Sequence, residues 1–407
     1  MPNSFQGITS GLAELKNFYQ GPIVDQFNED TPIYRGAEKG KESWSGYQVV
    51  KPLKVRRNQG IGATTDGGTL PQIGRQATIQ ALIAAKFNYL RFGITGPMIK
   101  ASASDKGSFV RAAAYELQEG YKDLQADINR QMSWDGTGDL ARVNTTLVAS
   151  TTLVIKGRED TEEAMKFMDV GTQFDVYTSG GALVQAGLTV SSITTASPTG
   201  ATATLVITPA LSATAGDILV RAGAGISSEV QGLLTQLDGG TSTVFNIDRA
   251  SYLQTQGNVI DMASAQLTLD KMQQAYNEAL RRGAGKLSAI YTDFASQRMY
   301  QKLLTADKRY VNSVKGDGGF ANKDVNYLEF NGIPVVADKD CPTRFFFLPE
   351  GVIKKYVLSE MEFADETGSM YLAQSDADSF ETRVRMFCNL FNEKAAACSV
   401  LKSYITP

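Results

Sequence analysis

The side chains that most often carry out catalysis are scarce in this sequence. Its 407 residues include no histidine, which excludes the commonest general base, the Ser-His-Asp and Cys-His arrangements and most zinc sites. The three cysteines, Cys341, Cys388 and Cys398, are too few and too scattered for a disulfide scaffold or a Cys-x-x-Cys metal site. The sequence therefore argues against an enzyme and predicts no catalytic residue and no cofactor.

Two pairs of aspartates and one glycine-rich loop contain residue types that bind ions. Asp338 and Asp340, and likewise Asp376 and Asp378, stand two positions apart and offer the oxygen ligands that hard cations prefer. Neither pair has further ligand spacing, so we interpret both as solvated loops and predict no metal. The loop GIGATTDGG at residues 60–68 lacks the Gly-Lys-Ser/Thr ending of a phosphate-binding loop. A flexible hairpin tip fits it better.

Charged residues of opposite sign gather on two separate segments. We name the cations of the first segment the basic set, and they stand against one acid, Asp66: Lys51, Lys54, Arg56, Arg57 and Arg75. We name the anions of the second segment the acidic set: Glu116, Glu119, Asp123 and Asp127. Either set is a solvated face unless another surface packs on it, so the elements that carry the two sets decide their meaning.

The acidic set lies on a segment that predicts one unusually long helix, Ser108–Trp134. Its apolar residues recur at steps of three or four, the period of one helical face: Phe109, Ala113, Leu117, Tyr121, Leu124, Ile128 and Met132. Ser104 or Asp105 can cap its start, and Gly136 and Gly138 end it. At about 1.5 Å per residue the helix is roughly 40 Å long. Its narrow stripe covers one sheet or partner and leaves the other side free.

The basic set lies on a predicted two-stranded excursion, residues 44–100, with a glycine-rich tip between its two arms. The second arm alternates as a strand does, although residues 78–86 also fit a helix. The alternation changes parity near Tyr89–Leu90, where we expect a bulge. Before the excursion, residues 1–43 are expected to form an extended arm, because Pro22 and Pro32 disfavour helix around them.

The rest of the chain divides into a β-rich part and a mixed part. Residues 153–222 contain five short Thr/Val-rich runs separated by turn residues, which is typical of a compact β module. From Gly225 onward the pattern alternates, with helices predicted at Ser264–Arg282 and after Asp293 as cap. From residue 379 the end of the chain predicts paired strands: Thr382, Val384, Met386 and Cys388 alternate along the first, and the second, Ala395–Tyr404, pairs antiparallel with it.

Composition limits the partners and the compartment. The net charge of −3 and the pI near 5.4 provide no basic footprint, so tight nucleic-acid binding is not expected to be the main task. The amino-terminal residues lack the pattern of a signal peptide, and no apolar run reaches about 18 residues. We expect a cytosolic chain without a membrane segment.

The order of these pieces resembles the tailed-bacteriophage major capsid protein of the Hong Kong 97 fold. The glycine-rich helix exit WDGTGDL, the strand-turn-strand YLEFNGIPVVAD and the closing FNEKAAACSVL are similar to steps of that family. The resemblance implies an α+β fold with an extended N-terminal arm, a long β-hairpin extended loop, a spine helix, peripheral and axial domains, and an inserted β module. The implied division is 1–43 arm, 44–100 extended loop, 101–152 peripheral domain with spine helix 108–134, 153–222 inserted module, 223–345 axial domain and 346–407 strands returning to the peripheral domain.

The implied function is self-assembly into an icosahedral shell, the virion capsid, that encloses double-stranded DNA without sequence-specific binding. The implied partners are other copies of the chain in hexamers and pentamers, a separate scaffolding protein and a portal, with a decoration protein left open, and assembly is expected in the host cytoplasm. The alternatives are an encapsulin-like nanocompartment shell, which lacks a module like 153–222, and a β-rich tail or surface-array protein, which does not explain the long helix.

The resemblance also gives the two charged sets a meaning. If the extended loop lies across a neighbour's spine helix, the basic set of one subunit meets the acidic set of the next and sets the register between them. The alternative, two solvated faces, stays open, since exposed ion pairs contribute only about 0–1 kcal/mol each. Some family members cross-link a loop lysine to an asparagine, for which Lys51 or Lys54 with Asn392 would be the pair; we expect no cross-link here.

Overall fold

The structure is a computed structural model that describes most of the chain: residues 31–42, 44, 46–97, 106–159, 162–194, 200–306, 328–364, 372–373 and 377–405. The side chains of residues 106–118 are not described. Most of the predicted N-terminal arm, residues 1–30, and Asp376 lie outside the described residues. None of the described helices is long and apolar enough to cross a membrane.

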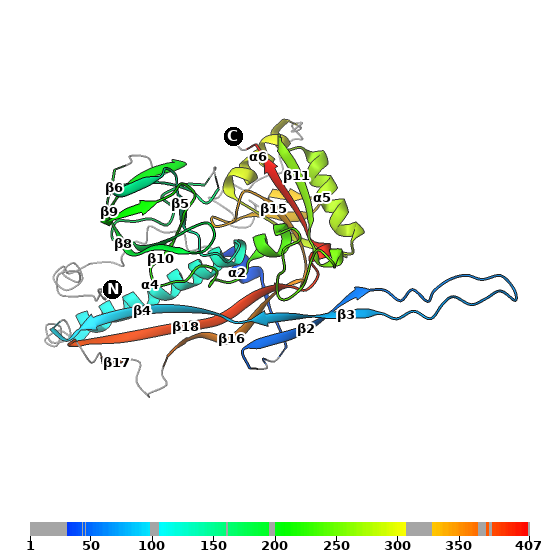
Figure 1. The fold of residues 1–407 in the computed structure, drawn as a ribbon, viewed down its shortest axis with the longest axis horizontal. Helices are drawn as coiled ribbons and strands as arrows, with labels where there is room; N and C mark the ends of the chain where they lie inside the picture. The colour runs from blue at the N-terminus through cyan, green and yellow to red at the C-terminus, as the bar shows by residue number, and fades with distance from the viewer. Residues whose placement is uncertain are drawn as a thin grey trace, which may run out of the picture.

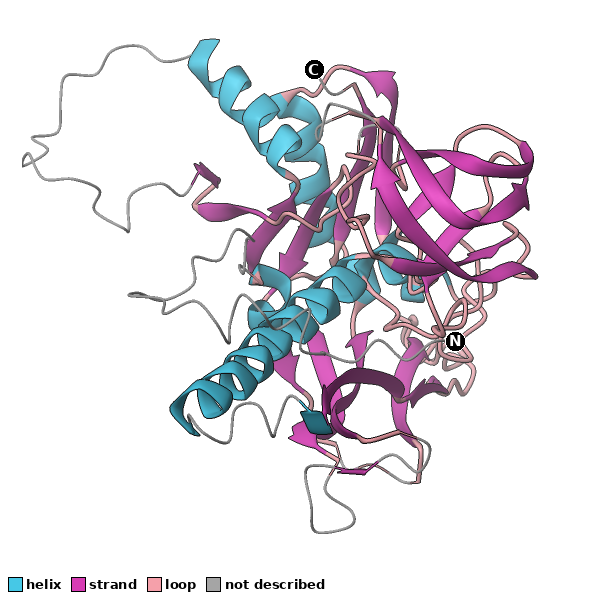
Figure 2. Ribbon diagram, turned by 90° about the vertical axis from the view of Figure 1, so that its left-hand side faces the viewer, coloured by secondary structure: helices cyan, strands magenta, loops and turns pink. Residues whose placement is uncertain are grey.

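The predicted long helix is present as α4, Lys106–Ser133, with 28 residues. Its apolar stripe is buried at Leu124, Ile128 and Met132, and the helix ends before Gly136 and Gly138, which both take positive φ angles. These three side chains share one core with residues from two different sheets. Strands accordingly lie on both sides of α4 (Figures 1 and 2). The helix covers two sheets, whereas the sequence pattern predicted one.

The first sheet has five strands and lies along α4 (Figure 1). Its path is β1 (Glu38–Lys39), β16 (Ile353–Phe363), β18 (Ser379–Asn392) and β17 (Leu372–Ala373), with β4 (Lys86–Thr95) paired to β18. Val384, Met386 and Cys388 of β18 pack into the core that contains α4. On β4, Leu90 lies so close to Gly120 of α4 that a Cβ there would be 2.6 Å from the leucine. A glycine inside the helix therefore permits this close approach.

The second sheet has six strands and two helices on one face. Its order is β11 (Asn258–Ala265), β19 (Ser399–Tyr404), β15 (Phe345–Pro349), β12 (Leu287–Thr292), β14 (Ile333–Ala337) and β13 (Leu328–Phe330). Phe345 and Phe347 point toward the core under α5 (Leu269–Arg281) and α6 (Phe294–Ala306). The alternate residue, Phe346, belongs to the core that contains α4. This sheet is thus covered on both faces.

The five β runs predicted between residues 153 and 222 form part of a closed six-stranded barrel (Figure 1). Around the barrel the order is β10 (Ile218–Arg221), β5 (Ala141–Val143), β6 (Leu147–Lys156), β9 (Thr202–Ala213), β8 (Leu183–Ile193) and β7 (Gln173–Tyr177). Leu153, Phe174 and Leu205 are among the side chains of its separate core. The barrel also takes in β5, which precedes the predicted module.

The predicted excursion is a hairpin of β2 (Gln48–Arg56) and β3 (Ala77–Ala84) that projects from the body of the molecule (Figure 1). The helical alternative for residues 78–86 is wrong, because β3 pairs with β2 and β4 pairs with β18. The expected bulge at Tyr89–Leu90 is also wrong, since β4 pairs without a register shift. The parity changes instead at Lys86, between buried Ala85 and exposed Phe87, where the chain passes from one sheet to the other.

Two other expectations are corrected near the ends of the chain. Pro32 opens the short helix α2 (Pro32–Gly36), because proline needs no hydrogen-bond partner in a first helical turn. The strands β18 and β19 do not pair: β19 lies between β11 and β15 in the six-stranded sheet. The short 3-10 helix η3 (Ala395–Ala397) lies between the two strands, and Ala395 and Ala397 are buried. It connects the five-stranded sheet to the six-stranded sheet.

The remaining elements are short. The π-helix η1 (Leu234–Asp238) and the 3-10 helix η2 (Leu253–Thr255) precede β11. The helix expected from Ser264 begins later, at Leu269, because β11 continues to Ala265 and Thr268 caps α5 by accepting from the Lys271 amide at 3.3 Å. The hairpin β13–β14 turns at Asn331 and Gly332, which both have positive φ angles, as its Asn-Gly sequence predicts.

Candidate assembly surfaces and the junction behind them

The hairpin is fixed at its root by one lysine between two carboxylates. Lys51 forms ion pairs with Glu42 and, at 2.8 Å, with Glu393. Glu393 also accepts a hydrogen bond from the Tyr356 hydroxyl at 2.9 Å and pairs with Lys354 at 3.2 Å. Partial burial lowers the pKa of Lys51, but the hydrogen bonds to Glu393 and Glu42 outweigh it and raise the pKa overall. The first member of the basic set therefore anchors its own hairpin.

Apolar packing fixes the same root. Val49, Ala81 and Ile83 of the hairpin share a core with Phe245 and Phe391, and the amide of Leu82 donates to the carbonyl of Phe245 at 2.9 Å. Because both strands of the hairpin contribute to this core, the direction in which the hairpin projects is set by packing as well as by charge.

Beyond the root, the hairpin carries exposed cations and exposed apolar side chains. Lys54, Arg56, Arg57 and Arg75 are all exposed. Three apolar residues of the tip, Ile61, Leu70 and Ile73, are exposed by 84%, 77% and 103%. Apolar side chains gathered on a projection have no core of their own to enter, which is typical of an interaction surface.

The asparagine considered for a cross-link is buried. Asn392 lines a cavity of about 120 Å³ together with Lys54. Its side-chain amide donates to the sulfur of Cys398 at 3.2 Å, and its side-chain oxygen accepts from the Lys394 amide at 2.9 Å. Both ends of the Asn392 side chain are thus engaged inside the chain.

The acidic set does not form one free face. Glu119 pairs with Lys122 at 3.0 Å. Asp127 pairs with Arg130 and with Arg221, each at 3.0 Å; burial would raise its pKa, but the two guanidinium groups hold it well below the usual range. Asp123 is exposed and also has an interaction inside the chain, while the side chain of Glu116 lies outside the described part.

An aromatic patch, which the sequence analysis did not identify, lies on the outer face of the five-stranded sheet. We define it as Phe87, Tyr89 and Phe387. The rings of Phe87 and Tyr89 lie 5.0 and 5.6 Å from the ring of Phe387 in edge-to-face contacts, and Phe87 and Tyr89 are 54% and 56% exposed. The alternating pattern of Lys86–Thr95 places Phe87 and Tyr89 on one face of the strand. The sequence alone suggested that this face is buried, and the pairing of β4 with β18 shows that it points outward.

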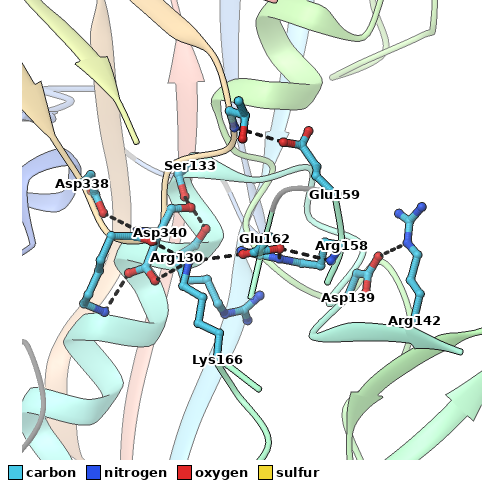
Figure 3. Close-up of polar contacts among 12 residues, drawn as sticks. Arg130, Ser133, Asp139, Arg142, Arg158, Glu159, Glu162, Lys166, Asp338 and Asp340 are labelled. Atoms are coloured by element: carbon cyan, nitrogen blue, oxygen red, sulfur yellow. Dashed lines mark hydrogen bonds and ion pairs between the residues drawn. The ribbon is translucent and has the colours of Figure 1, made fainter. Parts of the chain in front are cut away.

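Behind these surfaces lies a buried polar network, which we name the three-way junction. It joins three segments: the end of α4 (Asp127–Trp134), the base of the barrel (Arg158–Phe167) and the loop Asp338–Arg344 that follows β14. Figure 3 shows their charged side chains converging. Most of these groups are deeply buried, with Arg130, Asp338 and Asp340 exposed by 1%, 1% and 0%. The junction therefore depends on internal partners for each charge.

The barrel base holds α4 through an arginine stacked between aromatic rings. The Arg158 guanidinium lies 3.8 Å from the ring centroid of Trp134 and 4.9 Å from that of Phe167. It also forms a two-point ion pair with Glu162, of which one contact is 2.8 Å long. Burial would raise the pKa of Glu162, but the hydrogen bond and charge of Arg158 lower it to about 2.

The paired aspartates Asp338 and Asp340 belong to this junction, so the interpretation of them as a solvated loop is wrong. Asn129 donates to Asp338 at 2.9 Å, and Lys339 pairs with Asp340 at 2.9 Å. Burial, followed by the charge of Asp340, raises the pKa of Asp338 to about 6. Among the described residues, no group of three or more His, Cys, Asp or Glu side chains is arranged to hold a metal ion.

The comparisons with known proteins agree at the level of the fold. No family model and no curated protein matches the chain. A chain from the capsid asymmetric unit of cyanophage A-1(L) is similar over 96% of this chain and 97% of its own, with a TM-score of 0.57 and 14% identity. Chains from the capsids of native and empty GTA particles are similar with TM-scores of 0.51, at 10% and 8% identity, over 99–100% of both chains.

These likenesses define the class of fold. The chain is a mixed α+β protein with a capsid-type architecture, and the similarity covers nearly its whole length. More particularly, it shares this architecture with the shell chains of a cyanophage and of GTA particles.

Proposed function

We propose that the chain is a major capsid protein of the Hong Kong 97 type that assembles into an icosahedral shell around double-stranded DNA. The observation that carries the proposal is the hairpin: a rigidly rooted projection with exposed cations and apolar residues, on a capsid-type fold. Beyond its root, the exposed apolar part of the hairpin has no core in its own chain to enter, so it gains burial only against another copy.

In this proposal the elements take the roles that the resemblance implies. Helix α4 is the spine, the five-stranded sheet forms the peripheral domain, the six-stranded sheet with α5 and α6 forms the axial domain, and the barrel is the inserted module. Copies gather into hexamers and pentamers in the host cytoplasm, with a separate scaffolding protein and a portal. The net charge of −3 suits a wall that encloses DNA without gripping it.

The basic set contributes to register through its exposed members. Lys51 anchors the root and Asp127 serves the three-way junction, so we assign the contact between subunits to Lys54, Arg56, Arg57 and Arg75. On the acidic side we assign it to Glu116, Glu119 and Asp123. In Figure 1 the hairpin tip lies far from α4 of its own chain, and the partner of the tip is therefore a neighbouring copy.

The test is assembly of the purified full-length chain followed by negative-stain electron microscopy. The unaltered chain should form closed shells. The double variant Arg56→Glu/Arg57→Glu should give at least tenfold fewer shells, because like charges then face each other across the contact, while circular dichroism and melting stay unchanged. The control Arg56→Lys/Arg57→Lys keeps the charge and should assemble.

Two outcomes would count against the proposal. An unaltered chain that stays monomeric under all assembly conditions would contradict the function itself. Normal shell yield from the Glu variant would leave the function standing but would remove Arg56 and Arg57 from the contact.

A further inference from the structure

The barrel has an apolar core of its own, but its base also contacts other parts of the chain. Its apolar core is separate from the cores that contain α4 and the six-stranded sheet. Its chain enters directly after α4 and leaves before η1. A module of this kind needs only a tether at those two points. The barrel has more than that, because its base also contacts the loop Asp338–Arg344, about 180 residues further along the sequence.

The contacts of the three-way junction form a closed triangle. On its first side the barrel holds α4, through Arg158 against Trp134 and through the pair of Arg221 with Asp127 at 3.0 Å. On its second side α4 holds the loop: Asn129 donates to Asp338 at 2.9 Å, and the Ser133 hydroxyl donates to the carbonyl of Asp340 at 2.9 Å.

The third side joins the barrel directly to the loop. Glu159 accepts from the Thr343 amide at 3.0 Å and forms an ion pair with Arg344. Lys166 donates to the carbonyl of Lys339 and lies 3.8 Å from Asp340. A barrel that was only tethered would not need these contacts, because the loop belongs to the six-stranded sheet and has no part in closing the barrel.

The loop Asp338–Arg344 is attached firmly to the six-stranded sheet. It connects β14 to β15, and the amide of Asp338 donates to the carbonyl of Thr292 at the end of β12 at 2.8 Å. Arg344 also donates to Asp238 at 2.9 Å, which pairs with Lys402 of β19 at 2.7 Å. A shift of the loop would therefore carry the four central strands of the sheet, β19, β15, β12 and β14, with it.

Burial makes the triangle cooperative. The charges that join the barrel to the loop are largely buried: Asp340 is 0% exposed, and the side chains of Arg344 and Glu159 are 16% and 23% exposed. Opening the side between barrel and loop would take Lys166 away from Asp340 and would leave Glu159 without its guanidinium partner, which is costly where water is largely excluded. The three segments consequently hold together or come apart as a group.

We propose that the barrel acts as an internal clamp: its base, Arg158–Phe167, locks the loop Asp338–Arg344 onto the end of α4 and thereby fixes the angle between α4 and the six-stranded sheet. The inference rests on contacts within one chain. It does not depend on the proposed shell.

Hydrogen–deuterium exchange on the full-length chain tests the clamp. Glu159→Gln removes the charge that joins the barrel to the loop and leaves the barrel core intact. We expect exchange to become about tenfold faster in residues 338–344 and 129–134, as befits the loss of one charge-assisted contact, with no change in the barrel strands β6 and β9. Lys166→Met, which breaks the other contact on the same side, should give the same pattern.

The matched control is Glu360→Gln, which breaks the exposed pair of Lys39 with Glu360, each 59% exposed, and should leave exchange in both segments unchanged. Faster exchange confined to residues 157–169 in both test variants would overturn the clamp and identify the barrel as a tethered module. Unchanged exchange in residues 338–344 would overturn it as well.

Discussion

Asp139 is fully buried beside the three-way junction and has one good partner. It accepts from the Nε atom of Arg142 at 2.6 Å, while its second oxygen has no hydrogen-bond partner within the described structure. Burial, only partly offset by Arg142, raises the pKa of Asp139 from 3.8 to about 6. The folded chain thus holds this proton more tightly than the unfolded chain does, so the contribution of Asp139 to stability is full below about pH 4 and is lost as the pH rises through about 6.

The raised pKa of Asp139 predicts that the stability of the fold depends on pH. In Asp139→Asn the ionisation is removed, so the free energy of unfolding of the variant relative to the unaltered chain should rise by about 1–3 kcal/mol between pH 4 and pH 7. Urea unfolding at a series of pH values measures this difference. A difference that does not change with pH would contradict the assigned cause.

At the scale of elements, Lys51 at the hairpin root helps to fix the direction in which the hairpin projects. Lys51→Met leaves Glu42 and Glu393 facing each other without the cation between them. We expect the body of the protein to stay folded while the free energy of unfolding falls by about 1–3 kcal/mol and proteolysis within residues 57–76 becomes faster. Limited proteolysis with mass spectrometry measures the effect. The Lys54→Met variant, changed three residues further along β2, should be cut at the rate of the unaltered chain, and equal rates for both variants would refute the anchoring role.

Elements whose pattern is local could be predicted, and their partners could not. The stripe from Leu124 to Met132 repeats every three or four residues, so the sequence predicts α4 almost to its ends. The pairing of β19 depends on β11, some 140 residues earlier, and alternation alone does not distinguish β11 from β18 as its neighbour. The error at β18–β19 has this cause.

The candidate site shows the same division. The basic set lies on one hairpin as its sequence clustering predicted. The burial of Asp338 was not predictable, because Asn129, whose side-chain amide donates to it, lies 209 residues earlier in the sequence. Likewise, the aromatic patch became recognisable only once the partner of β4 fixed which face of the strand is outward.

At the scale of the whole molecule, several cores share one chain. The barrel core is distinct from the core under α5 and α6, so unfolding need not be two-state. Leu205→Ala, at a fully buried barrel position, should lower barrel stability by about 2–5 kcal/mol and speed hydrogen exchange in β6–β9 while β12 and β15 stay protected. Leu401→Ala, buried in the six-stranded sheet, should give the opposite pattern. A uniform increase in both variants would show a single cooperative unit.

The pairing of β4 with β18 has a kinetic consequence. Arg91 and Glu381, which join these strands at 2.7 Å, are 290 residues apart in the chain. Closing so long a loop costs conformational entropy before the contacts between the strands can stabilise it, and proteins rich in such long-range contacts fold slowly. The β2–β3 hairpin and the barrel are built from nearer neighbours and can form early. The five-stranded sheet, and with it the cover along α4, is therefore expected to be the last part of the chain to fold, leaving a time window in which the hairpin and the barrel are structured while the edge of β18 that receives β4 is still open.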